Sequence, residues 1–314
     1  MKRLSIQALA TRSLLVVTMV AILCATDVTR SGALLAQEID TDSNTPDPAA
    51  NVFYTTSGGG PNGADLFAID VSGSQTGTRH IGPTFGGACA SLALSTSGTL
   101  YSMCGPLFGE QQLATIDRKT GRADLFGAKV SGLAVMALAF AENRILYAVG
   151  DCNPDPTSHF ECTPGADSNY NSLYRVDENT GVFTRVGATG AAQFFMDLAF
   201  DRYGDLFGVT TTLNYSALPA ILYRIDLATG KATSIVNLVG SNSVMGLAFG
   251  HDGRLYGTDF VQNPGIYLID MNTGFETAIG ALPFGRSSGL ELVEKDGMDQ
   301  SDPRPRAMNK IHDS

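Results

Sequence analysis

Leu222-Tyr223-Arg224-Ile225-Asp226, followed by Thr229-Gly230, is the stretch that decides the fold, because the same phrase occurs five times along the chain. Successive copies of the aspartate lie 44 to 60 residues apart. A period of this length indicates a repeat architecture rather than an ordinary globular domain. The other copies are Leu66-Phe-Ala-Ile-Asp70, Leu113-Ala-Thr-Ile-Asp117, Leu173-Tyr-Arg-Val-Asp177 and Ile266-Tyr-Leu-Ile-Asp270, with Thr-Gly pairs at Thr76-Gly77, Thr120-Gly121, Thr180-Gly181 and Thr273-Gly274.

A second phrase, Leu247-Ala-Phe249, keeps the same phase as the first and confirms that the repeat is not a coincidence. A turn at His251-Asp252-Gly253 and an aromatic segment at Leu255-Tyr256 follow it. Segments of four to six residues separated by Gly and Asp turns are typical of antiparallel strands. The counterparts of the second phrase are Leu92-Ala-Leu94, Leu138-Ala-Phe140, Leu198-Ala-Phe200 and Leu290-Glu-Leu292.

Each repeat therefore predicts four short strands, and no stretch of useful length has helical periodicity. Four strands in about 40–50 residues are typical of one blade of a β-propeller. The sequence predicts an all-β fold, a five-bladed β-propeller.

The two ends of the repeat array predict how the ring closes. The array opens in mid-repeat with Val52-Phe-Tyr-Thr55, which matches the second strand of a blade. It ends with Gly289-Leu-Glu-Leu-Val293, which matches a first strand. Pairing the N-terminal strand with the C-terminal strand completes one blade and removes two exposed sheet edges. An open array would need capping repeats with polar outer faces, and neither end resembles one.

Composition excludes several classes of protein. The chain has 314 residues, of which 44% are hydrophobic and 17% charged, so most of it can be buried and disorder of the whole chain is excluded. The formal net charge is −10. Binding to nucleic acid requires a basic surface, so no nucleic-acid partner is expected.

The N-terminal segment has the pattern of a secretory signal. Lys2, Arg3 and Arg12 precede an apolar run, Leu14–Ala25, that is shorter than the ~20 residues a membrane span requires. Cleavage after Ala36 is favoured, and cleavage after Ala25 is the alternative. We expect a secreted or periplasmic protein with no membrane span in the mature chain. The expected organisation is a signal peptide at 1–36, a disordered linker at 37–50, the propeller at 51–294 and a disordered tail at 295–314.

Four cysteines remain after the signal segment, an even number that suggests disulfides in an exported protein. In a hairpin centred between Thr96 and Ser97, Cys89 and Cys104 face each other, and we expect a cross-strand disulfide there. Cys152 and Cys162 lie in an insertion that lengthens one repeat, where a second local bridge would tether the loop. Metal ligation by these two cysteines is the alternative.

Several residues that resemble functional motifs are better explained by structure. The five repeated aspartates are interpreted as turn residues that accept backbone N–H bonds, with glycine in the left-handed position. The aromatic strands are interpreted as core between blades. Gly285-Arg-Ser-Ser-Gly289 matches a nucleophile pattern that needs a strand-to-helix turn, whereas here it leads into a strand. No catalytic residue is assigned.

The candidate binding residues follow from topology. The insertion at 151–171 and the segments Thr210–Pro219 and Asp259–Pro264 each follow a second strand, so all three are expected on one face, where they could form a loop-rich rim. Oxygen ligands converging there could hold Ca²⁺, and a solvated polar rim is the alternative. The candidate rim residues are Asp151, Asp155, Asp167, Asn169, Asn214, Asp259 and Asn263.

The repeated phrases resemble bacterial secreted β-propellers of the quinoprotein-like and YVTN-like repeat group over residues 51–294. That resemblance implies the fold, and its members include binding proteins, quinone-dependent dehydrogenases and lactonase-like metalloenzymes. The chain contains no Trp that could stack on a quinone. We expect a secreted binding module that presents a loop-rich rim to a protein, a glycan or a small ligand. The alternatives are a metal-assisted, Ca-dependent, lactonase-like hydrolase and a structural component of an envelope or matrix.

Overall fold

The computed structural model describes residues 51–58, 63–72, 75–106, 109–130, 133–152, 171–211, 219–240, 243–260 and 264–293. The signal, linker and tail segments expected from the sequence lie outside these residues, so those domain boundaries remain predictions. Among the described residues, no helix combines the length and hydropathy that a membrane crossing requires.

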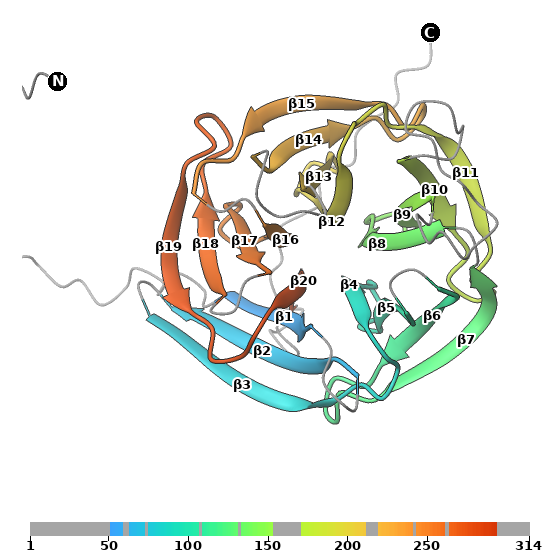
Figure 1. Ribbon diagram of the computed structural model, residues 1–314, viewed down its shortest axis with the longest axis horizontal. Helices are drawn as coiled ribbons and strands as arrows, with labels where there is room; N and C mark the ends of the chain where they lie inside the picture. The colour runs from blue at the N-terminus through green and yellow to red at the C-terminus, as the bar shows by residue number, and fades with distance from the viewer. Residues whose placement is uncertain are drawn as a thin grey trace, which may run out of the picture. The chain divides into compact units, whose positions relative to one another are not determined.

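The described residues form five four-stranded antiparallel sheets arranged around a central axis (Figure 1). The closing blade holds β20 (Ser287–Leu292), β1 (Asn51–Ser57), β2 (Asp65–Ser72) and β3 (Gln75–Pro83). The second blade holds β4 (Cys89–Leu94), β5 (Leu100–Cys104), β6 (Gln111–Ile116) and β7 (Ala123–Val130). The third holds β8 (Leu133–Phe140), β9 (Leu146–Cys152), β10 (Ser172–Val176) and β11 (Phe183–Ala188). The last two hold β12 (Phe194–Phe200), β13 (Leu206–Thr211), β14 (Ile221–Ile225) and β15 (Ala232–Asn237), and β16 (Val244–Phe249), β17 (Leu255–Asp259), β18 (Gly265–Ile269) and β19 (Glu276–Ala281).

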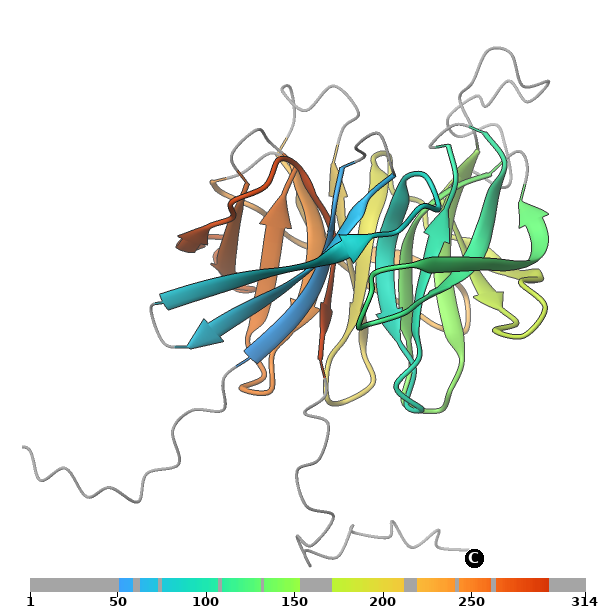
Figure 2. The ribbon, with the colours of Figure 1, turned by 90° about the horizontal axis from the view of Figure 1, so that it is seen from below.

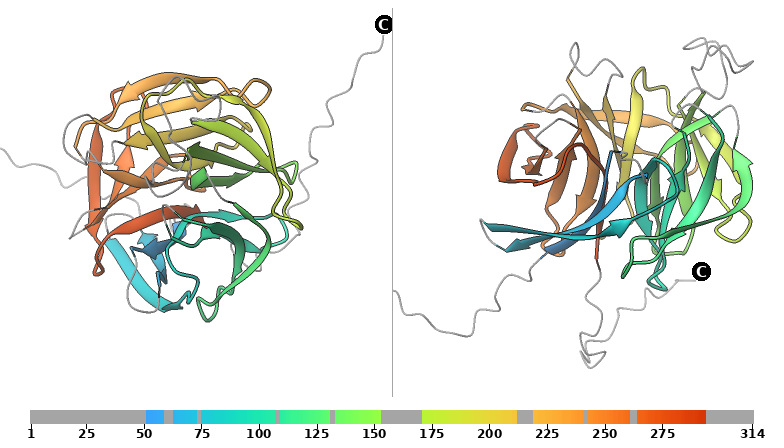
Figure 3. Two further views of the ribbon diagram at one scale, coloured as in Figure 1. Left: turned by 45° about the vertical axis from the view of Figure 1, so that its right-hand side comes forward. Right: turned by 60° about the horizontal axis from the view of Figure 1, so that its bottom comes forward.

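The predicted ring closure is confirmed. Strand β20 is the innermost strand of the closing blade and pairs antiparallel with β1, with Phe53 opposite Leu292 and Tyr54 opposite Glu291 (Figure 3). Val293 also donates its backbone N–H to the carbonyl oxygen of Val52 at 2.7 Å. The last described strand thus lies beside the first, and both are ordinary members of one sheet.

The Asp-x-x-Thr-Gly turns have the structural role predicted for them. The Oδ1 atom of Asp226 accepts the backbone N–H groups of Ala228 and Thr229, and Gly230 follows with a φ of 79°. Comparable bonds are made by Asp117, Asp177 and Asp270. In all four turns hydrogen bonds from the turn hold the pKa of the aspartate below its usual value.

The first copy of this turn differs from the prediction. Strand β2 continues past Asp70 to Ser72, and Gly77 lies opposite Asp70 within the ladder to β3 instead of in a left-handed turn position. The reason is the spacing, because Thr76-Gly77 follows Asp70 three residues later than in the other repeats. The longer interval lets both strands extend before the chain reverses.

The Thr-Gly turns also join neighbouring blades, a role that the sequence did not predict. A Cβ atom on Gly187 of β11 would lie 2.1 Å from the carbonyl oxygen of Thr229, in the turn of the next blade. A Cβ on Gly82 of β3 would lie 2.1 Å from the carbonyl oxygen of Thr120 in the same way. Each of these outer strands has a bulge near its glycine. The missing side chain allows backbone of one blade to lie directly against the next.

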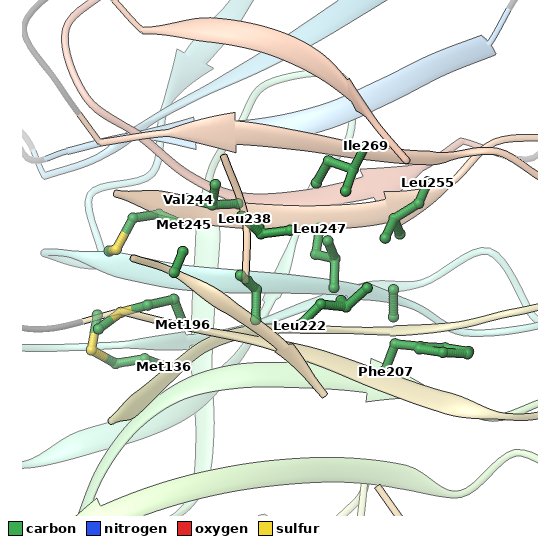
Figure 4. Packing of buried hydrophobic residues seen from close by; sticks show 13 residues of the cluster. Met136, Met196, Phe207, Leu222, Leu238, Val244, Met245, Leu247, Leu255 and Ile269 are labelled. Carbon is green, nitrogen blue, oxygen red and sulfur yellow. The ribbon is translucent and has the colours of Figure 1, made fainter. Parts of the chain in front are cut away.

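The hydrophobic core lies between the blades, as predicted for the aromatic strands. Tyr147 of β9 packs against Phe200 of β12 in the next blade, with 5.8 Å between ring centroids. Phe207 of β13 packs against Phe249 of β16 at 5.4 Å. The largest buried cluster spans β8, β12–β14 and β16–β18 (Figure 4).

The predicted disulfide between Cys89 and Cys104 is confirmed. The two residues face each other across β4 and β5, and their Cα atoms are 4.1 Å apart. Nothing can be said of the side chain of Cys152, and Cys162 lies outside the described residues. A second bridge therefore stays a prediction.

Candidate functional site

The five innermost strands β4, β8, β12, β16 and β20 surround the axis of the ring, and each has a bulge (Figure 1). In β16, for example, Val244 lies opposite Asp259 and Gly246 opposite Thr258, which leaves Met245 without a partner. A bulge interrupts the ladder and re-aims the groups beside it. The bulges therefore release backbone N–H groups near the axis from pairing with the second strand.

Asp197 of β12 accepts several of these released donors. Its Oδ2 atom accepts the backbone N–H of Leu247 in β16 at 2.8 Å and that of Leu290 in β20 at 3.0 Å. Its Oδ1 atom accepts the hydroxyl of Ser91 in β4 at 2.7 Å. Because β4 and β20 belong to blades that do not neighbour the blade of Asp197, this carboxyl group lies at the axis.

Ser91 extends the network to the remaining blade. Its Oγ atom accepts the backbone N–H of Leu138 in β8 at 2.7 Å. Ser91 has a φ of 60°, the left-handed conformation, which its bulge requires. Asp197 and Ser91 together thus bind all five blades, and we call these two residues with Leu138, Leu247 and Leu290 the axial cluster.

Burial dominates the electrostatics of the axial cluster. Asp197 has no solvent exposure, and its desolvation raises its pKa to about 8, against the opposing effect of the hydrogen bonds from Ser91 and from three backbone N–H groups. The neutral form fits the same geometry, because a protonated Oδ1 can donate to Ser91 while Oδ2 keeps both N–H donors. The cluster is a structural element whose state depends on pH.

On the side of the cluster where the first and second strands of each blade are joined, a cavity of about 550 Å³ opens. Its walls come from one repeated position, the last residue of the Leu-Ala-Phe phrase, so every blade contributes one apolar side chain. These five side chains are half-buried. We call this space the aromatic cavity, and its wall residues are Leu94, Phe140, Phe200, Phe249 and Leu292.

The mouth of the aromatic cavity is polar and carries more acidic than basic groups. Glu142, Asp201 and Glu291 line it, against Arg202 as the permanent cation. Arg202 donates to the hydroxyl of Tyr203 at 2.7 Å and lies over the ring of that tyrosine. The arrangement offers an apolar interior behind a negatively charged entrance. Thr96, Tyr203 and His251 complete the polar part of the lining.

Two residues of the predicted rim, Asp151 and Asp259, lie near the ends of β9 and β17, away from the turns that join these strands to the innermost strands of their blades (side view, Figure 2). Asp259 ends β17 and is buried. It accepts the backbone N–H of Gly265 at 2.7 Å and the hydroxyl of Tyr267 at 3.1 Å, so its carboxylate is bonded to two residues of β18. Burial and this neighbouring carboxylate raise the pKa of Tyr267 to about 12.

The other rim candidates cannot be placed. Asp151 is the second-last residue of β9, but its side chain is outside what the structure describes, and the remaining five lie outside the described residues entirely. Among the residues that are described, no three His, Cys, Asp or Glu side chains come together in an arrangement that could hold a metal ion. The calcium rim therefore stays a prediction, and its five unplaced residues are Asp155, Asp167, Asn169, Asn214 and Asn263.

Ser287 of the Gly-x-Ser-x-Gly stretch is a structural residue, as the sequence indicated. It begins the inner strand β20 and is fully buried. Its hydroxyl lies 2.7 Å from that of Thr55 in β1 and 2.9 Å from that of Thr258 in β17. These contacts tie the closing blade to its neighbour.

Sequence reasoning did not single out Asp197 as a functional or structural residue. A signal was available: Phe194-Phe-Met-Asp-Leu-Ala-Phe200 contains one acidic residue in an otherwise apolar strand. The corresponding residues in the other repeats are Ser91, Ala137, Gly246 and Gly289. A buried acid in a central strand requires hydrogen-bond donors, which predicts a polar contact at the axis.

Residues 136–289 match the family described as "Repeat of unknown function (DUF6923)". The matched range runs from β8 to β20 and covers the last three complete repeats. No curated protein matches the chain.

Solved structures with a similar arrangement include a gluconolactonase, XC5397, from Xanthomonas campestris, with 13% sequence identity, 76% of this chain and 79% of that chain covered, and a TM-score of 0.45. TolB from Acinetobacter baumannii also has 13% identity and a TM-score of 0.45, and the match covers 75% of this chain and 54% of TolB. A catalytically inactive virginiamycin B lyase from Staphylococcus aureus, solved with quinupristin, has 14% identity and a TM-score of 0.39. That match covers 78% of this chain and 75% of the lyase. At these identities no residue or activity is transferred.

Proposed function

We propose that this protein is an extracytoplasmic binding module that takes the apolar part of a small organic ligand into the aromatic cavity. The observation that carries the proposal is the wall of five apolar side chains, one from each blade, at the end of an open cavity. A concave apolar surface with a few polar groups at its mouth is the usual form of a small-molecule site.

The walls favour a compact ring or a short alkyl group. Phe140, Phe200 and Phe249 are each packed against an aromatic residue of the preceding blade, so their positions are fixed before a ligand arrives. A preformed site loses little conformational entropy on binding. The axial cluster forms the inner, buried end of the cavity, because Leu247 belongs both to the cluster and to the cavity lining.

The charge at the mouth favours a cationic ligand over an anionic one. Three carboxyl groups and one guanidinium group line the entrance, and the aromatic walls add the attraction of ring faces for a cation. We therefore expect a quaternary ammonium compound with a benzyl group to bind more tightly than a carboxylate of the same size.

Two observations outside the cavity favour a location outside the cytoplasm. The N-terminal sequence has the pattern of a secretory signal, and the Cys89–Cys104 disulfide is typical of an oxidising compartment. Cell fractionation with an antibody against the propeller tests this part of the proposal. Recovery of the protein from the cytoplasm with its signal segment intact would contradict it.

The absence of Trp from the sequence provides a clean test of the cavity. Thr96 is an exposed turn residue that lines the cavity, so Thr96→Trp places the chain's single indole at the mouth. Titration with benzyltrimethylammonium should change the indole fluorescence to saturation, and benzoate should bind at least tenfold more weakly. Leu125→Trp, on the outer strand β7, is the control and should not respond.

Leu94→Trp supplies the complementary test, because Leu94 is a half-buried wall residue of the cavity and a larger side chain there narrows it. Binding of benzyltrimethylammonium, measured by calorimetry, should be lost in this variant while the circular dichroism spectrum is retained. Equal binding by the parent and the folded variant, or no binding of either probe by the parent, would overturn the proposed site.

A further inference from the structure

Three methionines occupy the same position in three successive repeats. Met136, Met196 and Met245 each lie two residues before the leucine of the Leu-Ala-Phe phrase. The residues that precede them are Val, Phe and Val, and those that follow are Ala, Asp and Gly, so the neighbouring positions vary while methionine does not. The two remaining repeats have the small residues Ala90 and Ser288 at this position.

Each of the three methionines is the extra residue of a bulge in an innermost strand. The register of β8 against β9 shifts between Val135 and Ala137, and β12 and β16 shift in the same way around Met196 and Met245. A bulged residue has no cross-strand partner, and its side chain is re-aimed relative to a regular strand. Three neighbouring strands therefore direct equivalent side chains to the same region.

The three side chains are buried and belong to one contact cluster. Figure 4 shows their sulfur atoms gathered at one end of that cluster, with the thioethers of Met136 and Met196 pointing toward each other. Leu238, Val244 and Ala220 provide apolar surroundings. The result is a buried, apolar region that holds three thioether groups, one from each of three blades.

We propose that Met136, Met196 and Met245 form a binding site for a monovalent soft metal cation, Cu(I), for which Ag(I) is the experimental probe. Thioether sulfur is a soft ligand that prefers Cu(I) to Zn²⁺, Mg²⁺ or Ca²⁺. Methionine is also flexible enough for three side chains to converge on one ion without moving the strands that carry them. The apolar surroundings disfavour hard cations, which would lose their hydration shell there without gaining oxygen ligands.

The site is separate from the aromatic cavity, whose lining includes none of the three methionines.

The test is calorimetric titration of the purified protein with Ag(I), after alkylation of any free thiol to remove cysteine binding. We expect one Ag(I) per chain. The triple variant Met136→Leu, Met196→Leu, Met245→Leu should bind at least 100-fold more weakly, and each single variant at least tenfold more weakly. Leucine conserves the side-chain volume, so the fold should be retained. Met103→Leu and Met271→Leu are matched controls, because they remove thioethers elsewhere, and they should bind as the parent does.

A second readout identifies the ligand atoms. X-ray absorption of the Cu(I)-loaded parent should show sulfur neighbours around copper, and the Met103 and Met271 variants should give the same spectrum. The proposal is overturned if the parent binds no Ag(I), if the folded triple variant keeps the parent's affinity, or if nitrogen and oxygen neighbours replace sulfur. If the triple variant does not fold, the three single variants decide by the same criterion.

Discussion

The carboxyl group of Asp197 in β12 accepts the backbone N–H of Leu290 in β20 at 3.0 Å, which links the middle of the chain to its last described strand. The same oxygen accepts the N–H of Leu247, and the other accepts the hydroxyl of Ser91. One side chain thus holds donors from three other blades. These hydrogen bonds couple blades across the axis that are not neighbours in the ring.

Asp197→Leu should therefore destabilise the propeller strongly. Leucine has the same branching at Cγ but no acceptor, so the N–H groups of Leu247 and Leu290 and the hydroxyl of Ser91 lose their partner in a fully buried site. Each unpaired buried donor costs roughly 1–3 kcal/mol. We expect a loss of several kcal/mol in the free energy of unfolding, measured by urea denaturation. Asp124→Leu, at an exposed position in β7, should change it by less than about 0.5 kcal/mol. Equal effects of both substitutions would refute the role of the axial cluster.

Stability should depend on pH through the same residue. Burial raises the pKa of Asp197 to about 8 in the folded protein, from the ordinary aspartate value of 3.8. The folded state therefore holds a proton that the unfolded state has lost between these values, so stability is greatest near pH 4 and falls as pH rises toward 8. The full fall is up to about 5 kcal/mol.

Asp197→Asn isolates this contribution, because its amide can keep the carbonyl oxygen on the two N–H donors and its NH₂ group on Ser91. The variant should lose less stability than the parent between pH 5 and pH 8, when both are measured by denaturation at each pH. A parent whose stability rises over this range, or a variant with the same pH slope as the parent, would contradict the assignment.

The fold was predicted from the sequence because its signals are local and repeated. Asp226 and Gly230 mark one turn, and the recurrence of this turn every 44 to 60 residues implies the blades and their number. The axial cluster was not predicted, because its contacts join residues far apart in sequence through bulges, which residue types do not reveal. The aromatic cavity was missed for a related reason. Phe140, Phe200 and Phe249 were used only as markers of the repeat, and alternation along a strand does not show that a side chain borders a cavity.

The contact between blades predicts opposite results for two glycines in outer strands. Gly187→Ala places a methyl group 2.1 Å from the carbonyl oxygen of Thr229, so the neighbouring blades must move apart. Gly77→Ala meets only the Cβ of Asp70 at 3.7 Å, an ordinary contact. We expect Gly187→Ala to lower the unfolding free energy by about 1–3 kcal/mol and Gly77→Ala to leave it unchanged or slightly higher. Thermal unfolding followed by circular dichroism makes the comparison. Similar melting temperatures for both variants would show that the blades do not meet at Gly187.

Reduction of the Cys89–Cys104 disulfide should destabilise the second blade. The bridge closes a loop with a sequence separation of 15, for which the loss of chain entropy in the unfolded state is worth about 3 kcal/mol. Dithiothreitol should lower the melting temperature of the parent, and the Cys89→Ala, Cys104→Ala variant should start lower and show no further change from loss of this bridge. A parent that is insensitive to the reductant, with both thiols shown by alkylation to be free, would contradict the expected contribution.

The central claim is that the chain closes on itself through β1 and β20, since the axial cluster and the aromatic cavity both depend on it. Thr56 and Ser288 lie directly opposite each other in this pairing. In the variant Thr56→Cys, Ser288→Cys, peptide mapping should find an intramolecular disulfide between the two introduced cysteines in nearly every monomer, with a raised melting temperature. Two free thiols at these positions, or a bridge that joins two chains, would contradict the closed ring.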